Sequence, residues 1–123
     1  NYLAKLMSPR SLDYTASIEE IHHAEKLDSP SGTAISLAED IIKSSVYEKW
    51  ALGKENEKSL QIESFRDGNN PGTHSVSYVS KLDKISIKHQ AFKRDGFALG
   101  AVIAAEWLID KKGIFTINDV LKI

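Results

Sequence analysis

The 123-residue sequence contains no cysteine, which excludes disulfide bonds, thiolate catalysis and cysteine-ligated zinc sites. It also lacks an apolar run long enough to span a bilayer, because the longest one, from Phe97 to Ile109, is short and contains Glu106. An excess of either charge is missing too, since Lys plus Arg number 16 and Asp plus Glu number 17. This balance argues against a broad nucleic-acid or membrane surface, although it allows one local basic pocket.

The sequence begins at Asn1, and its only methionine is Met7. Residues 2–7 have the pattern of an amphipathic helix that no capping residue precedes. We therefore expect the chain to be a C-terminal fragment of a longer protein. With 41% hydrophobic and 27% charged residues, it can form one domain around one modest core.

The spacing of apolar residues predicts both helices and strands. We expect helices over 2–7, 32–45 and 96–112, strands over 15–22, 60–66, 74–80, 84–91 and 114–116, and a further helix start with a capping box at 116–119. In the first strand the expected inward positions are Ala16, Ile18 and Ile21. Residues 46–59 are mostly polar and are expected to be irregular, and Gly113 is the expected C-cap of the helix over 96–112.

This order of elements predicts an α+β fold with a mostly antiparallel or mixed four-stranded sheet and helices packed on one side. The strands over 74–80 and 84–91 should form an antiparallel hairpin. The helix over 96–112 is apolar on nearly every side. In so small a chain such a helix needs cover on most sides, and we expect another part of the protein or another subunit to supply some of it.

Three groups capable of proton transfer, His22, His23 and Lys26, lie close together at the end of the first predicted strand. A neutral imidazole, with an unperturbed pKa of about 6.5, can accept or donate a proton near neutral pH. Neighbouring side chains of a strand point in opposite directions, so the two histidines reach one substrate atom only if the chain turns there. The same spacing also fits two ordinary surface histidines and a solvated lysine.

The tripeptide Ser31-Gly32-Thr33 leads directly into a helical pattern. The free N–H groups of a first helical turn attract anions, and Gly32 would let a ligand approach the backbone. A plain N-cap at Ser31 explains the same residues without a ligand. General acids beside an anion site would suit chemistry on a carboxylate or a phosphate.

The remaining motifs carry weaker signals. No pair among His22, His23, His74 and His89 has the helical His-x3-His spacing, so we assign no metal. The sequence has neither a P-loop nor a Gly-x-Gly-x-x-Gly fingerprint for a dinucleotide.

Two arginines, Arg66 and Arg94, each precede a glycine-containing turn, and surface solubility is the simpler interpretation of both. Arg94 also follows a strand that looks buried. Arg94 could therefore reach a pocket.

Together these motifs form a specific combination that covers about Leu3 to Leu121. The matching segments are His22-His23-x-x-Lys26-x-Asp28-x-Pro30-Ser31-Gly32-Thr33-Ala34, Gly72-Thr73-His74, His89-x-Ala91-x-x-Arg94, Phe97-Ala98-x-Gly100-Ala101-Val102, Gly113-Ile114-Phe115 and Asp119-Val120-Leu121. The combination resembles dihydrodipicolinate reductase, also called 4-hydroxy-tetrahydrodipicolinate reductase.

The resemblance implies a cytoplasmic, homotetrameric NADPH- or NADH-dependent reductase of lysine and diaminopimelate biosynthesis, with no nucleic-acid or membrane partner. Its substrate would be a cyclic dicarboxylate, reduced to tetrahydrodipicolinate. In that family an N-terminal Rossmann domain binds most of the cofactor, and this domain is missing here. Residues 1–123 would form the C-terminal substrate-binding, catalytic and tetramerisation domain, with about 96–123 packing on the nucleotide domain. The fragment alone would be inactive.

By the same resemblance, His22 matches the family's proton donor and acceptor, and Lys26 matches its proton donor. The substrate-binding positions would be His23, Ser31, Gly32 and Thr33, and Arg94 would be a contact for the substrate or the nicotinamide. Between His22 and Lys26 the family often has basic residues, whereas this chain has Ala24 and Glu25. The alternative is a non-catalytic dicarboxylate-binding or oligomerisation module with the same fold.

Overall fold

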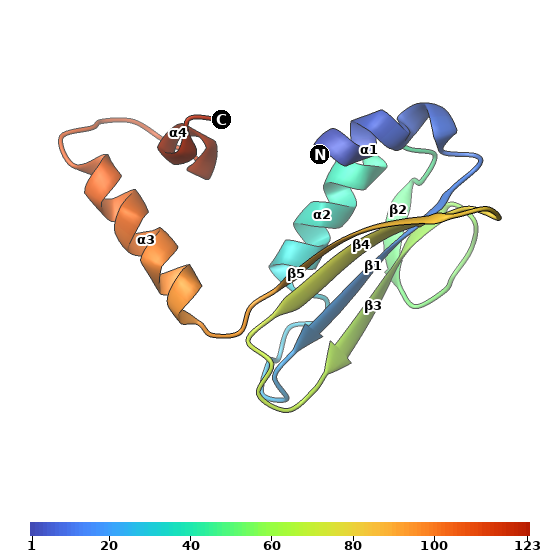
Figure 1. The fold of residues 1–123 in the computed structure, drawn as a ribbon, viewed down its shortest axis with the longest axis horizontal. Helices are drawn as coiled ribbons and strands as arrows, with labels where there is room; N and C mark the ends of the chain where they lie inside the picture. The colour runs from blue at the N-terminus through green and yellow to red at the C-terminus, as the bar shows by residue number, and fades with distance from the viewer. The chain divides into compact units, whose positions relative to one another are not determined.

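The structure, a computed structural model, describes all residues from 1 to 123. The chain divides into two compact units, Asn1–Phe92 and Lys93–Ile123, and each is described by itself (Figure 1). Unit 1 contains α1 (Tyr2–Met7), the 3-10 helix η1 (Ser8–Arg10), β1 (Thr15–His22), α2 (Gly32–Ile42), β2 (Lys49–Leu52), β3 (Ser59–Arg66), β4 (Thr73–Val79) and β5 (Lys84–Gln90).

The strands of unit 1 form one five-stranded sheet in the order β2-β3-β1-β4-β5. The central strand β1 pairs in parallel with β3 and antiparallel with β4. At the edges, β2 pairs in parallel with β3, and β5 completes an antiparallel hairpin with β4. The α+β class, the mixed sheet and the hairpin were therefore predicted correctly.

The sheet was predicted to have four strands and has five, because β2 lies inside the segment 46–59 that was expected to be irregular. This strand has only four residues, none of them fully buried. It is held by its parallel pairing with β3, in which Trp50 lies opposite Leu60. So short an edge strand leaves no alternating apolar pattern in the sequence.

The core of unit 1 lies between α2 and one face of the sheet, where α2 contacts β1, β2 and β3. Figure 1 shows α2 along this face of the strands. Ile18, Leu60 and Ile62 are almost completely buried there, and burying each such side chain contributes about 1.5–3 kcal/mol. As predicted, Ser31 caps α2, since its Oγ accepts the N–H of Ala34 at 3.2 Å. The helix ends at Ile42, earlier than expected.

The alternation of β1 places every second side chain, from Ala16 onward, on the core face. The prediction of Ile21 as an inward position was wrong, because Ile21 is only partly buried and Glu20 and His22 continue the inward set. Two polar residues therefore occupy the core face at the C-terminal end of β1. They lie where the chain leaves the strand toward the start of α2.

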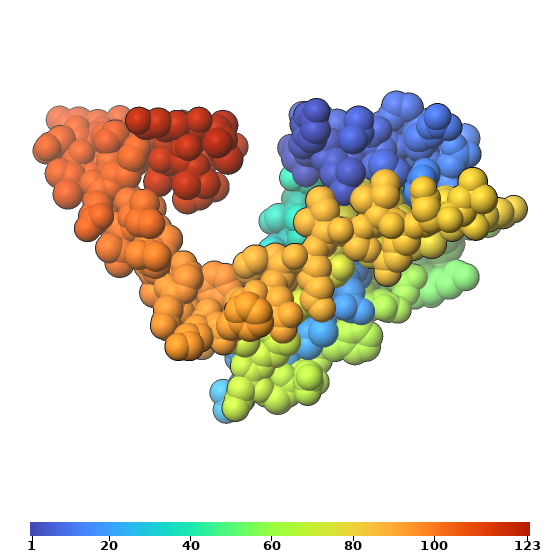
Figure 2. Space-filling view, in the orientation of Figure 1, coloured from blue at the N-terminus to red at the C-terminus, as the bar shows by residue number.

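Strand β5 is exposed along its whole length in this chain, and its surface is uncovered on the face seen in Figure 2. It nevertheless carries apolar side chains, with Ile85 38% and Ile87 58% exposed. An exposed apolar edge strand is a typical site of protein association.

Unit 2 contains α3 (Asp95–Leu108) and α4 (Ile117–Leu121). The prediction that Gly113 caps the first of these helices was wrong, because α3 ends at Leu108 and Asp110 takes the left-handed conformation beyond it, with φ 63°. The expected strand over 114–116 is absent. The capping box was predicted correctly, since the Asp119 carboxylate accepts from the N–H and the hydroxyl of Thr116. No helix in the chain has the length and apolar character needed to cross a membrane.

Candidate active site

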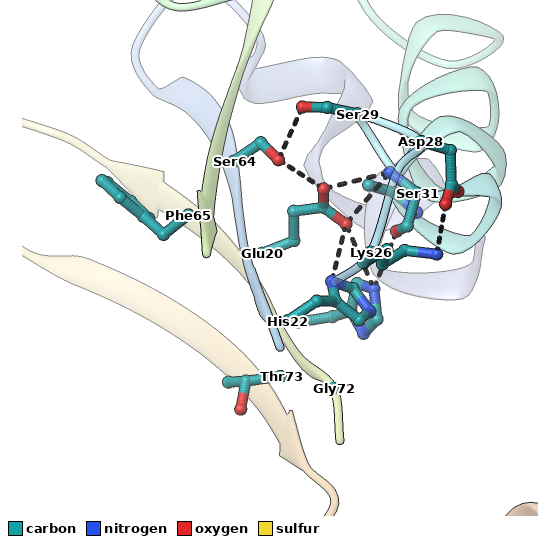
Figure 3. A network of polar contacts seen from close by, with 12 residues as sticks. Glu20, His22, Lys26, Asp28, Ser29, Ser31, Ser64, Phe65, Gly72 and Thr73 are labelled. Atoms are coloured by element: carbon teal, nitrogen blue, oxygen red, sulfur yellow. Dashed lines mark hydrogen bonds and ion pairs between the residues drawn. The ribbon is translucent and has the colours of Figure 1, made fainter. Parts of the chain in front are cut away.

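A cluster of polar side chains lies at the C-terminal end of β1, beneath the loop that leads into α2 (Figure 3). Glu20 and His22 reach it from β1 because both belong to the inward set of that strand. His74 of β4 lies directly opposite Glu20 in the antiparallel register, so it shares the same face. The loop 23–31 and the helix start cover this face.

Glu20 is the centre of the cluster and is 0% exposed. The Ser31 N–H donates to both of its carboxylate oxygens, at 3.0 and 3.1 Å, and the Ser64 hydroxyl donates to Oε1 at 2.6 Å. Burial by itself would raise the pKa of Glu20, but the hydrogen bonds from Ser31 and Ser64 outweigh it and lower this pKa. The carboxylate is therefore ionised at neutral pH.

His22 and His74 lie against this carboxylate with their rings edge to face, 4.9 Å apart between centroids. His22 Nδ1 is 3.3 Å from Glu20 Oε2 but is not aligned for a hydrogen bond, and this buried nitrogen has no other partner. His74 Nε2 lies 3.1 Å from Ser31 Oγ. Burial is the largest cause that lowers the pKa of both histidines, and the positive charge of Lys26 lowers both further. Both imidazoles are therefore neutral at neutral pH.

Lys26 lies on the loop above these imidazoles, with its side chain 21% exposed and its Nζ 2.7 Å from Asp28 Oδ1. Its charge is close enough to contribute to the lowered pKa of both His22 and His74. Glu25, whose orientation the sequence left open, is exposed to solvent. The ammonium and the two imidazoles are thus gathered in one place.

The first turn of α2 leaves two backbone donors free. The N–H of Ala34 is taken by Ser31 Oγ, and that of Ile35 by the Ser31 carbonyl. The N–H groups of Gly32 and Thr33 have no such partner, and both residues are exposed. Free N–H groups at the positive end of a helix dipole are suited to holding a carboxylate.

The structure brings most of the predicted site residues into this region. His22, Lys26 and Ser31 belong to the cluster, Gly32 and Thr33 follow it, and His23 lies half-buried at the end of β1. Arg94 precedes α3 in unit 2, is exposed, and makes no side-chain cap there. No relation of Arg94 to the cluster is therefore assigned.

Sequence reasoning missed the roles of Glu20, Ser64 and Arg66 in this cluster. Glu20 had a usable signal, because the alternation from Ala16 and Ile18 passes through it to His22. Ser64 and Arg66 gave no such signal, since they reach the cluster only through the pairing of β3 with β1.

One set of atoms in this cluster has the composition of a metal site. The ligand atoms of Glu20, His22 and His74 lie within 4.8 Å of one another. However, the carboxylate already accepts from Ser31 and Ser64, and His74 Nε2 is engaged with the Ser31 hydroxyl. A cation would have to displace these contacts, so we interpret the cluster as a hydrogen-bonded one.

The fold and this site define a class of protein, an α+β domain in which imidazoles and an ammonium are gathered near a helix start with two free backbone N–H groups. The family model described as "Dihydrodipicolinate reductase, C-terminus" matches residues 1–121. The chain belongs to this family.

Individual relatives agree with this assignment. The 4-hydroxy-tetrahydrodipicolinate reductase of Christiangramia forsetii is 56% identical over 110 residues, which cover 89% of this chain and 46% of the relative. That of Rickettsia rickettsii is 39% identical over 127 residues, covering 100% and 53%. The chain therefore spans about half the length of these curated relatives.

A solved structure shares the fold. The dipicolinate-bound dihydrodipicolinate reductase from Paenisporosarcina sp. TG-14 superposes with a TM-score of 0.64 at 22% identity, over 93% of this chain and 47% of that one.

Proposed function

We propose that this chain is the substrate-binding and catalytic half of a 4-hydroxy-tetrahydrodipicolinate reductase. The reaction would be the NAD(P)H-dependent reduction of a cyclic dicarboxylate to tetrahydrodipicolinate in lysine and diaminopimelate biosynthesis. The observation that carries the proposal is the gathering of Lys26 and His22 next to a helix start whose Gly32 and Thr33 amides are free. The names of the relatives and the dipicolinate bound to the solved neighbour support it.

The chain carries no glycine-rich fingerprint for the phosphates of a nicotinamide cofactor. Of the two strand-to-helix connections, β1 to α2 carries Ser31-Gly32-Thr33 and β5 to α3 spans residues 91–94, and neither has the glycine-rich turn of a dinucleotide site. NADPH or NADH, bound mainly on a domain outside this chain, would supply the hydride. The fragment alone is therefore expected to be inactive.

The residues of the chain would bind the substrate and deliver a proton. One substrate carboxylate would lie on the amides of Gly32 and Thr33, where the helix start favours an anion by about 0.3–1 kcal/mol for each interaction. The imidazole of His23 would contact the second carboxylate. As negative charge develops on the ring, Lys26 or His22 would protonate it. Lys26 is the better donor of the two, because its side chain is 21% against 9% exposed and because the neutral imidazole of His22 would first have to take up a proton.

Substitution of Lys26 tests the catalytic role. In the chain joined to its nucleotide-binding domain, Lys26→Ala should lower kcat by about 100-fold or more while changing the KM for the dicarboxylate much less. Lys81→Ala, which removes an exposed lysine from the β4–β5 turn, is the control. Turnover is followed as NAD(P)H oxidation. A loss that lies entirely in KM would make Lys26 a binding residue instead.

The tetramer of the family would use surfaces that this chain leaves open. The apolar strand β5 would be covered by another subunit, and the exposed apolar residues of α3 would pack on the nucleotide domain. The same exposed surfaces favour the second candidate function, a non-catalytic dicarboxylate-binding or oligomerisation module. Turnover in the full-length protein separates the two, because only the reductase oxidises NAD(P)H in the presence of the substrate.

A further inference from the structure

Side chains of two neighbouring strands, β1 and β3, form hydrogen bonds with the loop that carries Lys26. Strands β1 and β3 run in parallel, with Glu20 opposite Ser64 and His22 opposite Arg66. Because side chains two residues apart share a face, Ser64 and Arg66 lie on the same side of the sheet as Glu20. This is also the side on which the loop 23–31 lies.

Arg66 makes the largest number of these contacts. Its Nε donates to the Lys26 carbonyl at 3.2 Å, and a terminal nitrogen donates to the Asp28 carbonyl. The other terminal nitrogen donates to Ser64 Oγ at 3.0 Å. The Lys26 ammonium is in turn paired with the Asp28 carboxylate. The two residues of this ion pair, Lys26 and Asp28, therefore both have their backbone carbonyls hydrogen-bonded to the guanidinium of Arg66.

Ser64 connects this guanidinium to the buried carboxylate. Its hydroxyl donates to Glu20 Oε1 at 2.6 Å and accepts from the Ser29 hydroxyl at 2.9 Å and from Arg66. One donated and two accepted bonds use the full capacity of a hydroxyl. Arg66 also lies 3.6 Å from Glu20 Oε1, so its charge compensates the carboxylate. Figure 3 shows Ser29, Ser64 and Glu20 joined in this order.

We propose that Arg66 is a positioning residue that acts through the Lys26 and Asp28 carbonyls to fix the Lys26 ammonium beside the helix start. The inference rests on the proposed function, because it assumes that Lys26 meets the substrate there. A planar guanidinium can bind two carbonyls and a hydroxyl at once, whereas a lysine ammonium on a flexible stem cannot keep this geometry. Positive charge alone is therefore not sufficient at this position.

The experiment is Arg66→Lys in the chain joined to its nucleotide-binding domain, with Arg10→Lys as the matched control. The side chain of Arg10 is 70% exposed and its polar contact is with the Asp13 carboxylate at 3.5 Å, so the same substitution there should be silent. Arg66→Lys should lower kcat by about 10- to 100-fold, as expected when a catalytic group is displaced by about 1 Å. The KM for the nicotinamide cofactor should not change. Titration with pyridine-2,6-dicarboxylate gives the fraction of sites that bind the ligand. Dividing the rate by this fraction gives a kcat that misfolded protein does not lower.

A second measurement uses the 123-residue chain without ligand and does not depend on turnover. In Arg66→Lys the amides of the loop 23–31, including that of Lys26 bonded to the His23 carbonyl, should exchange with solvent faster than in the wild type and in Arg10→Lys. Unchanged exchange in the loop, or a kcat equal to that of Arg10→Lys, overturns the inference. If the wild type neither binds the dicarboxylate nor turns over, the proposed function fails, and the loop exchange still decides whether Arg66 holds the loop.

Discussion

The buried carboxylate of Glu20 is the most informative place to perturb the stability of unit 1. Glu20→Gln keeps the size of the side chain but replaces one acceptor oxygen with an amide nitrogen that cannot accept. In the wild type the carboxylate accepts hydrogen bonds from the Ser31 N–H and from the Ser64 hydroxyl, the latter at 2.6 Å. With its amide oxygen in the place of Oε1, the variant can still accept from both Ser31 and Ser64, but only through neutral hydrogen bonds. Its amide nitrogen, in the place of Oε2, then faces the Ser31 N–H, whose nitrogen lies 3.1 Å from Oε2.

The magnitude follows from the bonds that are lost. Hydrogen bonds to a charged group contribute about 1.5–3 kcal/mol and neutral ones about 0.5–1.5 kcal/mol. Replacing two charged bonds by two neutral bonds should therefore lower the free energy of unfolding by about 2–3 kcal/mol. For a domain of this size that corresponds to a fall in Tm of about 10 °C.

The assay is thermal and urea unfolding of the 123-residue chain, followed by circular dichroism. The control is Glu63→Gln, because Glu63 lies on the neighbouring strand β3 but is exposed, and it should change the free energy by about 0.5 kcal/mol or less. A Glu20→Gln variant as stable as Glu63→Gln would refute the reasoning. It would mean that the carboxylate contributes no net stability through Ser31 and Ser64.

Two further predictions concern pH and a close backbone approach. Burial lowers the pKa of His22 and His74 below the ordinary value of 6.5, so the unfolded chain binds protons first as the pH falls. The Tm should therefore drop between about pH 7 and pH 5, His74→Gln should flatten this slope, and a Tm that rises on acidification would contradict it. At Gly72, with φ 152°, an added Cβ would lie 3.3 Å from His22 Nε2, so Gly72→Ala should cost about 1–3 kcal/mol in urea unfolding. Gly100→Ala, whose Cβ meets nothing, should cost less, and equal effects would count against the close approach.

The parts of the fold that local pattern determines were predictable from the sequence. Alternation identified β1, and Ser31 identified the start of α2. The short strand β2 was missed because it depends on its partner β3. The end of α3 was misplaced because Asp110, not Gly113, takes the first left-handed position after the helix.

The site divides in the same way between local and long-range features. Lys26 and the helix start lie in one continuous segment, so the sequence alone places them near one another. Arg66 lies 40 positions from Lys26 and meets its carbonyl only because β3 pairs in parallel with β1. A parallel pairing of this kind is set by the crossover through α2, and no local spacing of residues reveals it.

The claim that the helix start of α2 and the adjoining loop bind a small dicarboxylate is tested most directly by one titration. Pyridine-2,6-dicarboxylate is added to the isotopically labelled chain, and the backbone amide resonances of Gly32 and Thr33 are followed by NMR. We expect saturable binding, with these two amides among the most strongly shifted. No saturable binding, or shifts that leave Gly32, Thr33 and the loop 23–31 unchanged at saturation, would contradict the claim.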